Sequence, residues 1–283
     1  MSEESGTKMD ETTANTRRKR RFSRIPMRFV LPNLVTLLAI CLGLTSIRFA
    51  TEQKFEMAAI FIVLAAVLDG LDGRLARALD GASRFGAELD SLADFVDFGV
   101  APAFLLYFWS LHEIPSFGWF AALVFAIAAA LRLARFNVMI DDPNKPAWQA
   151  QFFVGMPAPA GAIAALLPIY LSYSVFGLPQ GRIYSALEIV YLLGIAFLMA
   201  SRIPHFSGKQ IGRVPREYFI VVLFAVAVFI LALASFPMEV LIALTVSYLA
   251  LLPIAIRRHA RLSAQSEAGL GVSSATLEAP KTP

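Results

Sequence analysis

Charged residues are scarce in this chain of 283 residues. Asp, Glu, Lys and Arg make up 16% of it, whereas about 25% is usual for soluble domains. Hydrophobic residues make up 57%, and the mean hydropathy is +0.64. This composition excludes an ordinary soluble protein and predicts an all-α polytopic membrane protein.

Cysteine and histidine are also rare. Cys41 is the single cysteine, which excludes an intrachain disulfide and a cysteine metal cluster. The histidines His112, His205 and His259 lie far apart and lack the spacing of zinc ligands. No small-residue cleavage site follows a short apolar core, so no removable signal peptide is expected.

Apolar segments of the ~20-residue length that a bilayer requires recur along the chain. We therefore predict about eight transmembrane helices, followed by a disordered tail over 259–283. A disordered tail over 1–19 and an interfacial amphipathic helix over 20–30 are expected before the first of them. The predicted transmembrane segments lie near residues 31–50, 55–79, 84–109, 117–138, 156–176, 184–201, 217–235 and 238–257.

Basic residues are unevenly distributed. A run of Arg and Lys over 17–28 precedes the first predicted helix, which is typical of an anchor on anionic lipid headgroups. Nucleic-acid binding is the weaker interpretation, because no aromatic-lined basic domain accompanies the run. Most basic residues of the predicted loops fall on one side of the membrane, and the other side holds Arg48, Lys54 and Arg182. We expect the more basic side, with both termini, to be cytoplasmic.

Four aspartates interrupt the second and third predicted helices. Asp69 and Asp72 are three residues apart and share one helix face, and Asp90 and Asp94 are four apart and share a face of the next helix. Antiparallel packing would bring all four together near the cytoplasmic face. Carboxylates in one apolar pocket repel each other unless they are compensated, and hard divalent cations prefer such ligands. Two such ions sharing ligands could clamp phosphate oxygens during transfer.

Small and basic residues surround these acids. Gly73, Ala76 and Gly86 remove side-chain bulk, which permits close helix approach or leaves room for a nucleotide. Arg77 and Arg84 flank the acids and could bind phosphate oxygens in a bidentate manner.

A plainer interpretation pairs the acids with Arg74, Arg77 and Arg84 in surface salt bridges. It does not explain Asp90 and Asp94, which recur on one face of an apolar helix.

The pattern Asp69-x2-Asp72-Gly73-x2-Ala76-Arg77-x8-Gly86-x3-Asp90-x3-Asp94 resembles the full signature of the CDP-alcohol phosphotransferases, with all eight fixed positions within 26 residues. Members of that family displace CMP from a CDP-linked lipid with an alcohol. The resemblance implies a six-helix core in a catalytic transmembrane domain over 31–215, two additional transmembrane helices over 216–258, and a homodimer.

The resemblance also implies residue roles. Asp69, Asp72 and Asp90 would ligate metal, and Asp94 would sit at a second metal and act as general base on the alcohol. The metals would be two Mg²⁺ or Mn²⁺ ions. The residues implied to shape the nucleotide and diphosphate site are Gly73, Ala76, Arg77 and Gly86, with Arg84 and Asn33 beside them.

Further stretches narrow the resemblance to the integral-membrane phosphatidylserine synthases of this family. They are Pro32-Asn33-Leu-Val-Thr36, Asp94 to Pro102, Leu131 to Asn137, and Gly155-Met-Pro-Ala-Pro159. This resemblance implies CDP-diacylglycerol and L-serine as substrates, membrane lipids as surroundings, and the bacterial cytoplasmic membrane as location.

Serine carries a carboxylate that choline, inositol and glycerol 3-phosphate lack. Arg132 and Arg135, three residues apart, could bind it, or they could be ordinary positive flank residues. Asn137 could hydrogen-bond the amino acid or cap its helix. Asp97 falls on the face of Asp94 and could bind the serine ammonium or partner an arginine.

Three alternatives stay open. A synthase of the same family could use choline, glycerol 3-phosphate or inositol. An aspartate-rich membrane prenyltransferase also clamps a diphosphate through metals, but its acidic motifs would lie on distant helices. A cation or proton transporter would show transport and no divalent-dependent CMP release.

Overall fold

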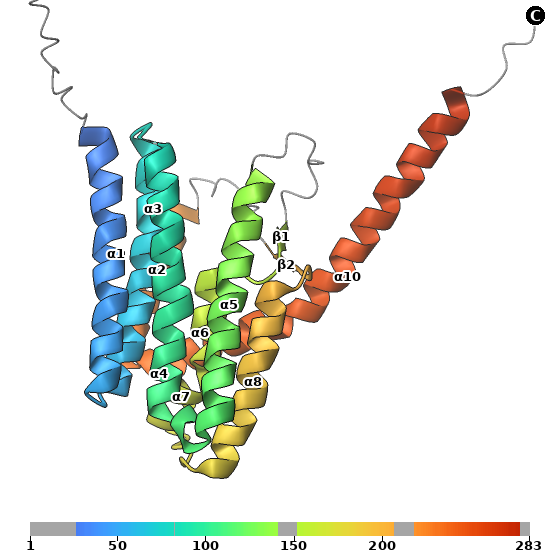
Figure 1. Ribbon diagram of the computed structural model, residues 1–283. Coiled ribbons are helices and arrows are strands. Elements are labelled where there is room, and N and C mark those ends of the chain that lie inside the picture. Colours follow the sequence, from blue (N-terminus) through green and yellow to red (C-terminus); the bar gives the residue numbers. More distant parts are fainter. Residues whose placement is uncertain (1–26, 82, 141–151, 207–217, 278–283) are drawn as a thin grey trace, which may run out of the picture.

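The computed structural model describes residues 27–81, 83–140, 152–206 and 218–277, and it is helical apart from two short strands (Figure 1). The first half of the chain forms α1 (Met27–Thr51), α2 (Phe55–Ala78), α3 (Arg84–Phe95), α4 (Ala101–Trp109) and α5 (Pro115–Ile140). The second half forms β1 (Phe152–Val154), α6 (Ala158–Ala165), α7 (Leu167–Tyr173), α8 (Arg182–Ala200), β2 (Pro204–Phe206), α9 (Phe219–Ser235) and α10 (Pro237–Leu277).

Five helical spans in the described part of the chain are long and apolar enough to cross a membrane. They are Val30–Thr51, Arg84–Trp109, Pro115–Met139, Arg182–Ala200 and Pro237–Arg258. This confirms the expectation of an all-α polytopic membrane protein. The figure of eight transmembrane helices stays a prediction, because α2 carries several charged residues, α6 and α7 are short, and the apolar part of α9 falls below this length.

Several elements differ from the sequence-based expectations. The segment predicted over 156–176 is divided into α6 and α7 around Leu166, and Pro168 follows in the first turn of α7. A π-helical turn, Val96–Val100, joins α3 to α4. The strands were not predicted: β1 and β2 pair antiparallel, with Phe153 opposite His205.

The chain ends also differ from the expectations. The tail predicted to be disordered over 259–283 is helical in the structure as far as Leu277, as part of α10. The tail over 1–19 and most of the interfacial helix over 20–30 lie outside the described residues, and α1 begins at Met27.

Small residues allow α1 and α2 to lie close together. Ala50 of α1 and Ala58 and Ala59 of α2 are buried, and Ser46 Oγ donates a hydrogen bond of 2.8 Å to the Ala58 carbonyl oxygen. Backbones can approach closely where side chains are this small. The α1–α2 pair therefore forms one wall of the bundle, and α3 and α4 pack against α1.

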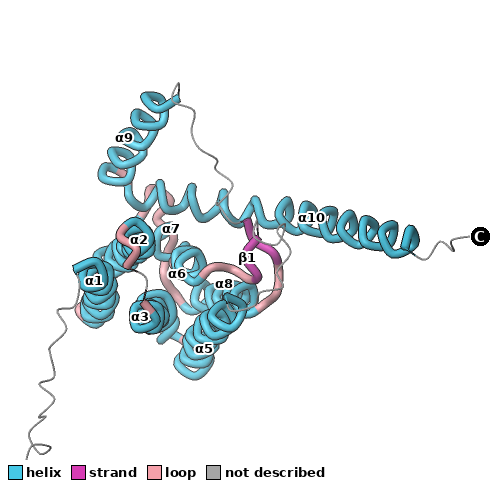
Figure 2. The backbone as a smooth tube through the Cα atoms, turned by 90° about the horizontal axis from the view of Figure 1, so that it is seen from above, coloured by secondary structure: helices cyan, strands magenta, loops and turns pink. Residues whose placement is uncertain are grey.

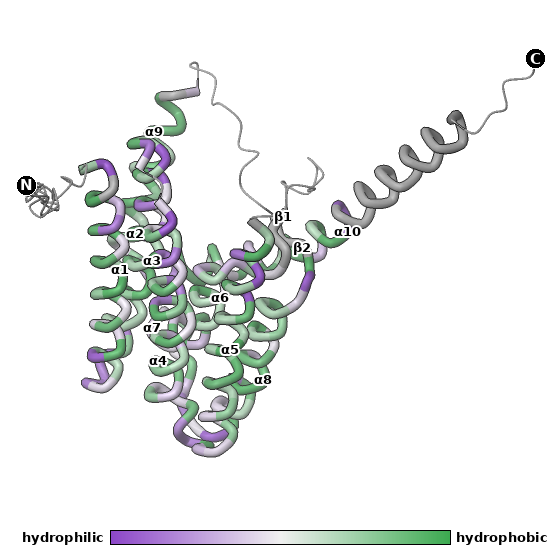
Figure 3. Tube along the Cα trace, turned by 45° about the horizontal axis from the view of Figure 1, so that its top comes forward, coloured by the Kyte–Doolittle hydropathy of each residue, from purple (hydrophilic) through white to green (hydrophobic). Residues whose placement is uncertain are grey.

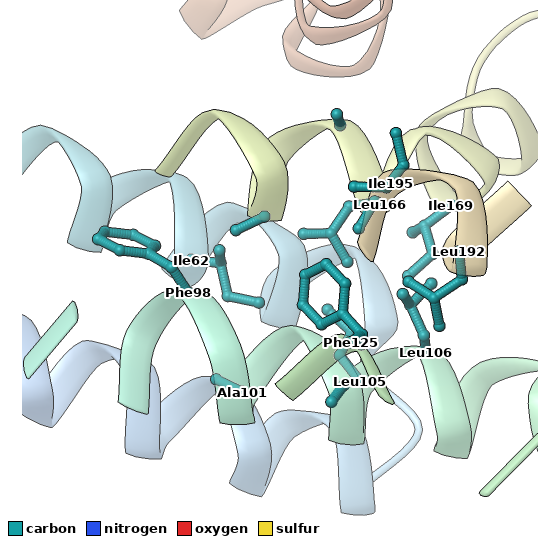
Figure 4. Close-up of a cluster of buried hydrophobic side chains, with 14 of the residues drawn as sticks. Ile62, Phe98, Ala101, Leu105, Leu106, Phe125, Leu166, Ile169, Leu192 and Ile195 are labelled. Atoms are coloured by element: carbon teal, nitrogen blue, oxygen red, sulfur yellow. The ribbon is translucent and has the colours of Figure 1, made fainter. Parts of the chain in front are cut away.

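An apolar core lies between α2, α4, α5, α6, α7 and α8 (Figure 4). Its largest fully buried side chains include Ile62, Phe98, Phe125, Leu166 and Leu192. Glu188 of α8 is fastened to the end of α4 by a hydrogen bond that Ser110 Oγ donates. Seen from above, α10 runs along the α6 and α7 side of the bundle, and α9 stands apart from it (Figure 2).

Candidate active site

The turn between α2 and α3 sets the geometry of the acidic residues. Asp80 adopts a left-handed backbone conformation with φ of 47°, which aspartate tolerates better than most residues. The Gly81 amide then donates a hydrogen bond of 2.9 Å to the Ala76 carbonyl oxygen, which ends α2. On the other side of the turn, Ser83 Oγ accepts the Gly86 amide at 3.0 Å and caps the start of α3.

This hairpin brings the aspartates together, as the spacing predicts. Carboxylate oxygens of Asp69, Asp72 and Asp90 all lie within 4.8 Å of one another. Asp94 joins them, because its carboxyl group and that of Asp69 are close enough to share a hydrogen bond. We refer to Asp69, Asp72, Asp90 and Asp94 as the acid cluster. Figure 3 shows hydrophilic positions among the hydrophobic ones along α2 and α3.

No salt bridge joins the acid cluster to a basic side chain within the described residues. The ion pairs found there join Glu52 to Arg48 and Lys54, and none involves the cluster. Arg77 is exposed, and its Nε donates to the Gly73 carbonyl oxygen at 2.9 Å. The structure thus does not show the surface salt bridges of the plainer interpretation. A donor set made only of carboxylate oxygens fits a hard divalent cation.

Helix α1 adds a neutral partner to the acid cluster. Thr36 Oγ1 donates a hydrogen bond of 2.7 Å to Asp72 Oδ2, and both side chains are buried. The same hydroxyl lies 3.2 Å from the Pro32 carbonyl oxygen, one turn earlier in α1. This role of Thr36 was not predicted from the sequence, although Thr36 lies in the stretch that begins at Pro32. A polar β-branched residue on an otherwise apolar helix was the available signal.

A cavity of about 150 Å³ lies beside the acid cluster. It contains four of the six residues predicted to shape the nucleotide site, namely Asn33, Gly73, Ala76 and Gly86. Arg77 and Arg84, the other two, are exposed and do not line it. The full lining is Pro32, Asn33, Thr36, Asp72, Gly73, Ala76, Gly81, Ser83, Gly86, Ala87 and Asp90.

Gly86 is needed for the close approach of α3 to α1 at this cavity. A Cβ atom at Gly86 would lie 2.9 Å from Asn33 Oδ1 and 3.1 Å from Ser83 Oγ. Any side chain here would therefore displace the Asn33 amide, which the sequence predicts to face the nucleotide.

Asp97 lies in the π-helical turn and is buried, with 1% of its surface exposed. Its Oδ1 has no hydrogen-bond partner within the described residues. The carboxylate packs directly over Gly43 of α1, where a Cβ atom would overlap Oδ1. Turns of this kind are frequent at functional sites, because the extra residue redirects neighbouring side chains.

Of the predicted serine-binding residues on α5, Arg132 is the one that interacts with the acid cluster. It is 8% exposed, and its guanidinium lies 5.3 Å from the centre of the Phe136 ring. It interacts electrostatically with Asp94 and Asp69. Among the side chains that the structure describes, it is the one basic group in the buried class.

The other two predicted serine-binding residues are engaged elsewhere. Arg135 Nη1 donates to the carbonyl oxygens of Ala200 and Ser201, at 2.7 and 3.0 Å, and so closes the carboxyl end of α8. Asn137 Nδ2 donates to Ser91 Oγ at 2.9 Å and joins α5 to α3. The structure therefore does not bring Arg135 or Asn137 into contact with the acid cluster.

Comparison with known proteins places this site in a family. Residues 29–199 match the CDP-alcohol phosphatidyltransferase family. The chain belongs to this family. The match covers α1 to α8 almost completely and includes every member of the acid cluster, whereas α9 and α10 lie beyond it.

Three curated relatives of this chain carry the same name. A protein of Mycobacterium leprae named CDP-diacylglycerol–serine O-phosphatidyltransferase is 43% identical over 242 residues, which cover 84% of this chain and 78% of the relative. A protein of the same name from Mycobacterium tuberculosis strain H37Rv is 40% identical over 84% of this chain and 82% of its own length. One from Helicobacter pylori strain 26695 is 35% identical over 71% and 82%.

Proposed function

We propose that this protein transfers the phosphatidyl group of CDP-diacylglycerol to the hydroxyl of L-serine, giving phosphatidylserine and CMP. The names of the relatives support this substrate pair. The structural observation that supports the chemistry is the meeting of Asp69, Asp72 and Asp90 within 4.8 Å, next to a cavity lined by glycine and alanine.

The acid cluster is the proposed metal site. Asp69, Asp72 and Asp90 would hold one divalent cation, and Asp94 would contribute to a second, with Mg²⁺ or Mn²⁺ as the ions. Ions bound there would neutralise charge on the transferring phosphate and on the departing CMP. In the proposed arrangement Asn33, Gly73, Ala76 and Gly86 surround the nucleotide, and Arg77 and Arg84 face its diphosphate from outside the cavity.

Asp94 is the proposed general base. Its carboxylate would accept the proton of the serine hydroxyl while the hydroxyl oxygen attacks the phosphorus next to the lipid. Its closeness to Asp69 supports this role, since it places the base beside the proposed metal ligands. The reaction would then be a direct displacement without a covalent enzyme intermediate.

Arg132 and Asp97 are the proposed contacts of the serine backbone. The buried Arg132 guanidinium suits the carboxylate of an amino acid, because it offers several donors in a fixed plane. The Asp97 carboxylate suits the ammonium group. Arg135 would support the site indirectly by holding the end of α8, and Asn137 by holding α3 against α5.

In the cell, the protein would lie in the bacterial cytoplasmic membrane as a homodimer, with the acid cluster and both termini on the cytoplasmic side. The lipid tails of CDP-diacylglycerol would reach the site laterally from the bilayer. The basic run over 17–28 would rest on anionic headgroups rather than on nucleic acid.

Release of CMP from CDP-diacylglycerol in detergent tests the proposal. With Mg²⁺ or Mn²⁺ present, L-serine should stimulate release, whereas choline, glycerol 3-phosphate and inositol should not. Asp94→Asn should lower the rate by about 10²- to 10⁴-fold, the usual contribution of a general base. Asp80→Asn is the matched control, because Asp80 is exposed in the turn and asparagine tolerates its left-handed backbone.

Stimulation by another alcohol alone would overturn the choice of serine. A full rate in folded Asp94→Asn would overturn the general-base assignment. Absence of CMP release with every alcohol, together with divalent-independent cation transport, would favour the transporter alternative.

A further inference from the structure

A second cavity, of about 560 Å³, lies between α5 and the segment that runs from the end of α3 through α4. Figure 2 shows α3 beside α5 when the bundle is seen from above. All twelve residues that line the cavity have aliphatic or aromatic side chains. Its volume falls within the range of about 300–1,000 Å³ that is usual for ligand pockets.

Alanines of α5 give this cavity the shape of a groove. Ala122, Ala126, Ala130 and Ala134 all line it and are four residues apart, so they follow one another along one side of the helix. Because their side chains end at Cβ, they leave space along α5. From Trp119, which also lines the cavity, to Ala134 the groove runs about 22 Å at the rise of an α-helix.

The groove opens towards the surroundings of the bundle. Leu123, Ile127 and Leu131 form a second row beside the alanines, and they are 42%, 57% and 54% exposed. At the far end, the rings of Phe104 and Trp119 meet edge to face with 6.0 Å between their centres. A long apolar molecule can therefore enter from the bilayer and lie along α5.

The near end of the groove lies at the depth of the acid cluster. Phe95, which lines the groove, directly follows Asp94 in α3. On α5, the lining residue Leu131 directly precedes Arg132, which interacts with Asp94. The groove thus begins beside the proposed site of phosphate transfer.

Two contacts leave a gap between α3 and α5 at this depth. One turn before Phe95, Ser91 Oγ accepts the hydrogen bond of 2.9 Å from Asn137. One turn after Phe95, a Cβ atom at Gly99 would lie 3.1 Å from the Ala129 Cβ atom, so the π-helical turn and α5 are in close contact. Between these two contacts the groove separates Phe95 from α5.

We propose that this groove holds one acyl chain of CDP-diacylglycerol while the diphosphate lies at the acid cluster. The inference rests on the proposed use of CDP-diacylglycerol, and it assigns a place to one of the two lipid tails. An acyl chain has no hydrogen-bonding groups, so it suits a lining that consists of aliphatic and aromatic side chains. The groove is also long enough, because one chain spans about half of the ~30 Å hydrocarbon core.

Kinetics of Ala126→Phe test the inference, because the phenyl ring would fill the groove about 12 Å from Ala134. With dioleoyl CDP-diacylglycerol the KM for this lipid should rise about tenfold, the effect of displacing about two methylene groups. With dihexanoyl CDP-diacylglycerol, whose tails are too short to reach residue 126, it should stay within about twofold. The kcat and the KM for serine should change by no more than that.

The matched control is Ala186→Phe, which places the same ring on an exposed position of α8 outside the groove. It should leave every constant unchanged. An equal rise of the KM for both lipids in Ala126→Phe would overturn the inference, as would an unchanged KM for the dioleoyl lipid. An unchanged KM together with an altered oligomeric state in size-exclusion chromatography would show that a second copy of the chain covers the groove instead.

Fluorescence of Trp119 gives a second measurement that requires no acceptor alcohol. In a Trp109→Phe/Trp148→Phe background, CDP-diacylglycerol with brominated acyl chains should quench Trp119, and unbrominated CDP-diacylglycerol should reverse the quenching. Equal quenching by brominated phosphatidylcholine would overturn the inference, because the groove would then bind any membrane lipid. Specific quenching without serine-dependent CMP release would contradict only the choice of serine, whereas CMP release without specific quenching would contradict only the acyl-chain site.

Discussion

The two ends of the α1–α2 pair contain acidic side chains in opposite surroundings. At the α1–α2 loop, Glu52 accepts hydrogen bonds of 2.8 Å from both Lys54 Nζ and Arg48 Nε. The hydrogen bond from Lys54, and to a smaller extent the one from Arg48, lowers the pKa of Glu52 below its ordinary value. At the other end, the acid cluster has no ion pair with any described basic side chain.

Glu52 and the acid cluster differ in the source of the positive charge that balances their carboxylates. The charge of Glu52 is balanced within the chain, at the surface, where such pairs contribute little. The acid cluster places four carboxylates near one buried guanidinium, that of Arg132. Repulsion between the carboxylates is then large unless protons or external cations bind. An arrangement that is unfavourable for folding alone is expected at a site that binds metal.

The largest effect is expected from Asp90→Asn, which reduces the repulsion and removes a proposed metal ligand. CMP release should fall by at least about a hundredfold, because metal ions contribute several kcal/mol to such transfers. Thermal denaturation in detergent should show the opposite sign: in EDTA the variant should be more stable than the unsubstituted protein, and Mn²⁺ should stabilise it less. Equal stabilisation of both proteins by Mn²⁺ would contradict the assignment of Asp90.

A smaller effect, on packing, is expected from Gly43→Ala. The added methyl group would overlap the Asp97 carboxylate and lie 3.0 Å from its Cγ. Overpacking of this kind costs about 1–3 kcal/mol, which thermal denaturation in detergent would detect, and serine-dependent CMP release should fall with it.

Two further variants serve as controls for Gly43→Ala. Gly194→Ala changes a glycine of α8 where an added Cβ meets nothing within 4 Å, so it should be neutral or slightly stabilising. The double variant Gly43→Ala/Asp97→Ala removes the overlap and should regain stability but not activity. Failure to regain stability would show that the packing of Asp97 over Gly43 is not the cause.

The sequence predicted the acid cluster because helical periodicity and a short turn determine it almost completely. Spacings of three and four residues place Asp69 with Asp72 and Asp90 with Asp94, and the turn at Asp80 allows only antiparallel packing. Helix positions were predictable for a similar reason, since apolar runs of the required length are separated by polar turns.

Features that depend on tertiary contacts were not predictable. Arg135 looked like a partner of Arg132 because both lie on one helix face, but its reach to the end of α8 depends on where α8 stops. The hydrogen bond from Thr36 to Asp72 joins residues 36 positions apart. The β1–β2 pair, likewise, joins segments far apart in the sequence.

The smallest effect is expected from Glu52→Gln, at the end of the α1–α2 pair opposite the acid cluster. CMP release should be unchanged. Because the pKa of Glu52 is lowered in the folded protein, its contribution to stability is present near neutral pH and is lost as the pH falls through that lowered value. A small deficit in thermal stability of Glu52→Gln at pH 7 should therefore vanish in acid, and high salt should reduce it. A deficit that grows in acid would show that the ion pairs of Glu52 are not its cause. A loss of CMP release would show that Glu52 affects the acid cluster.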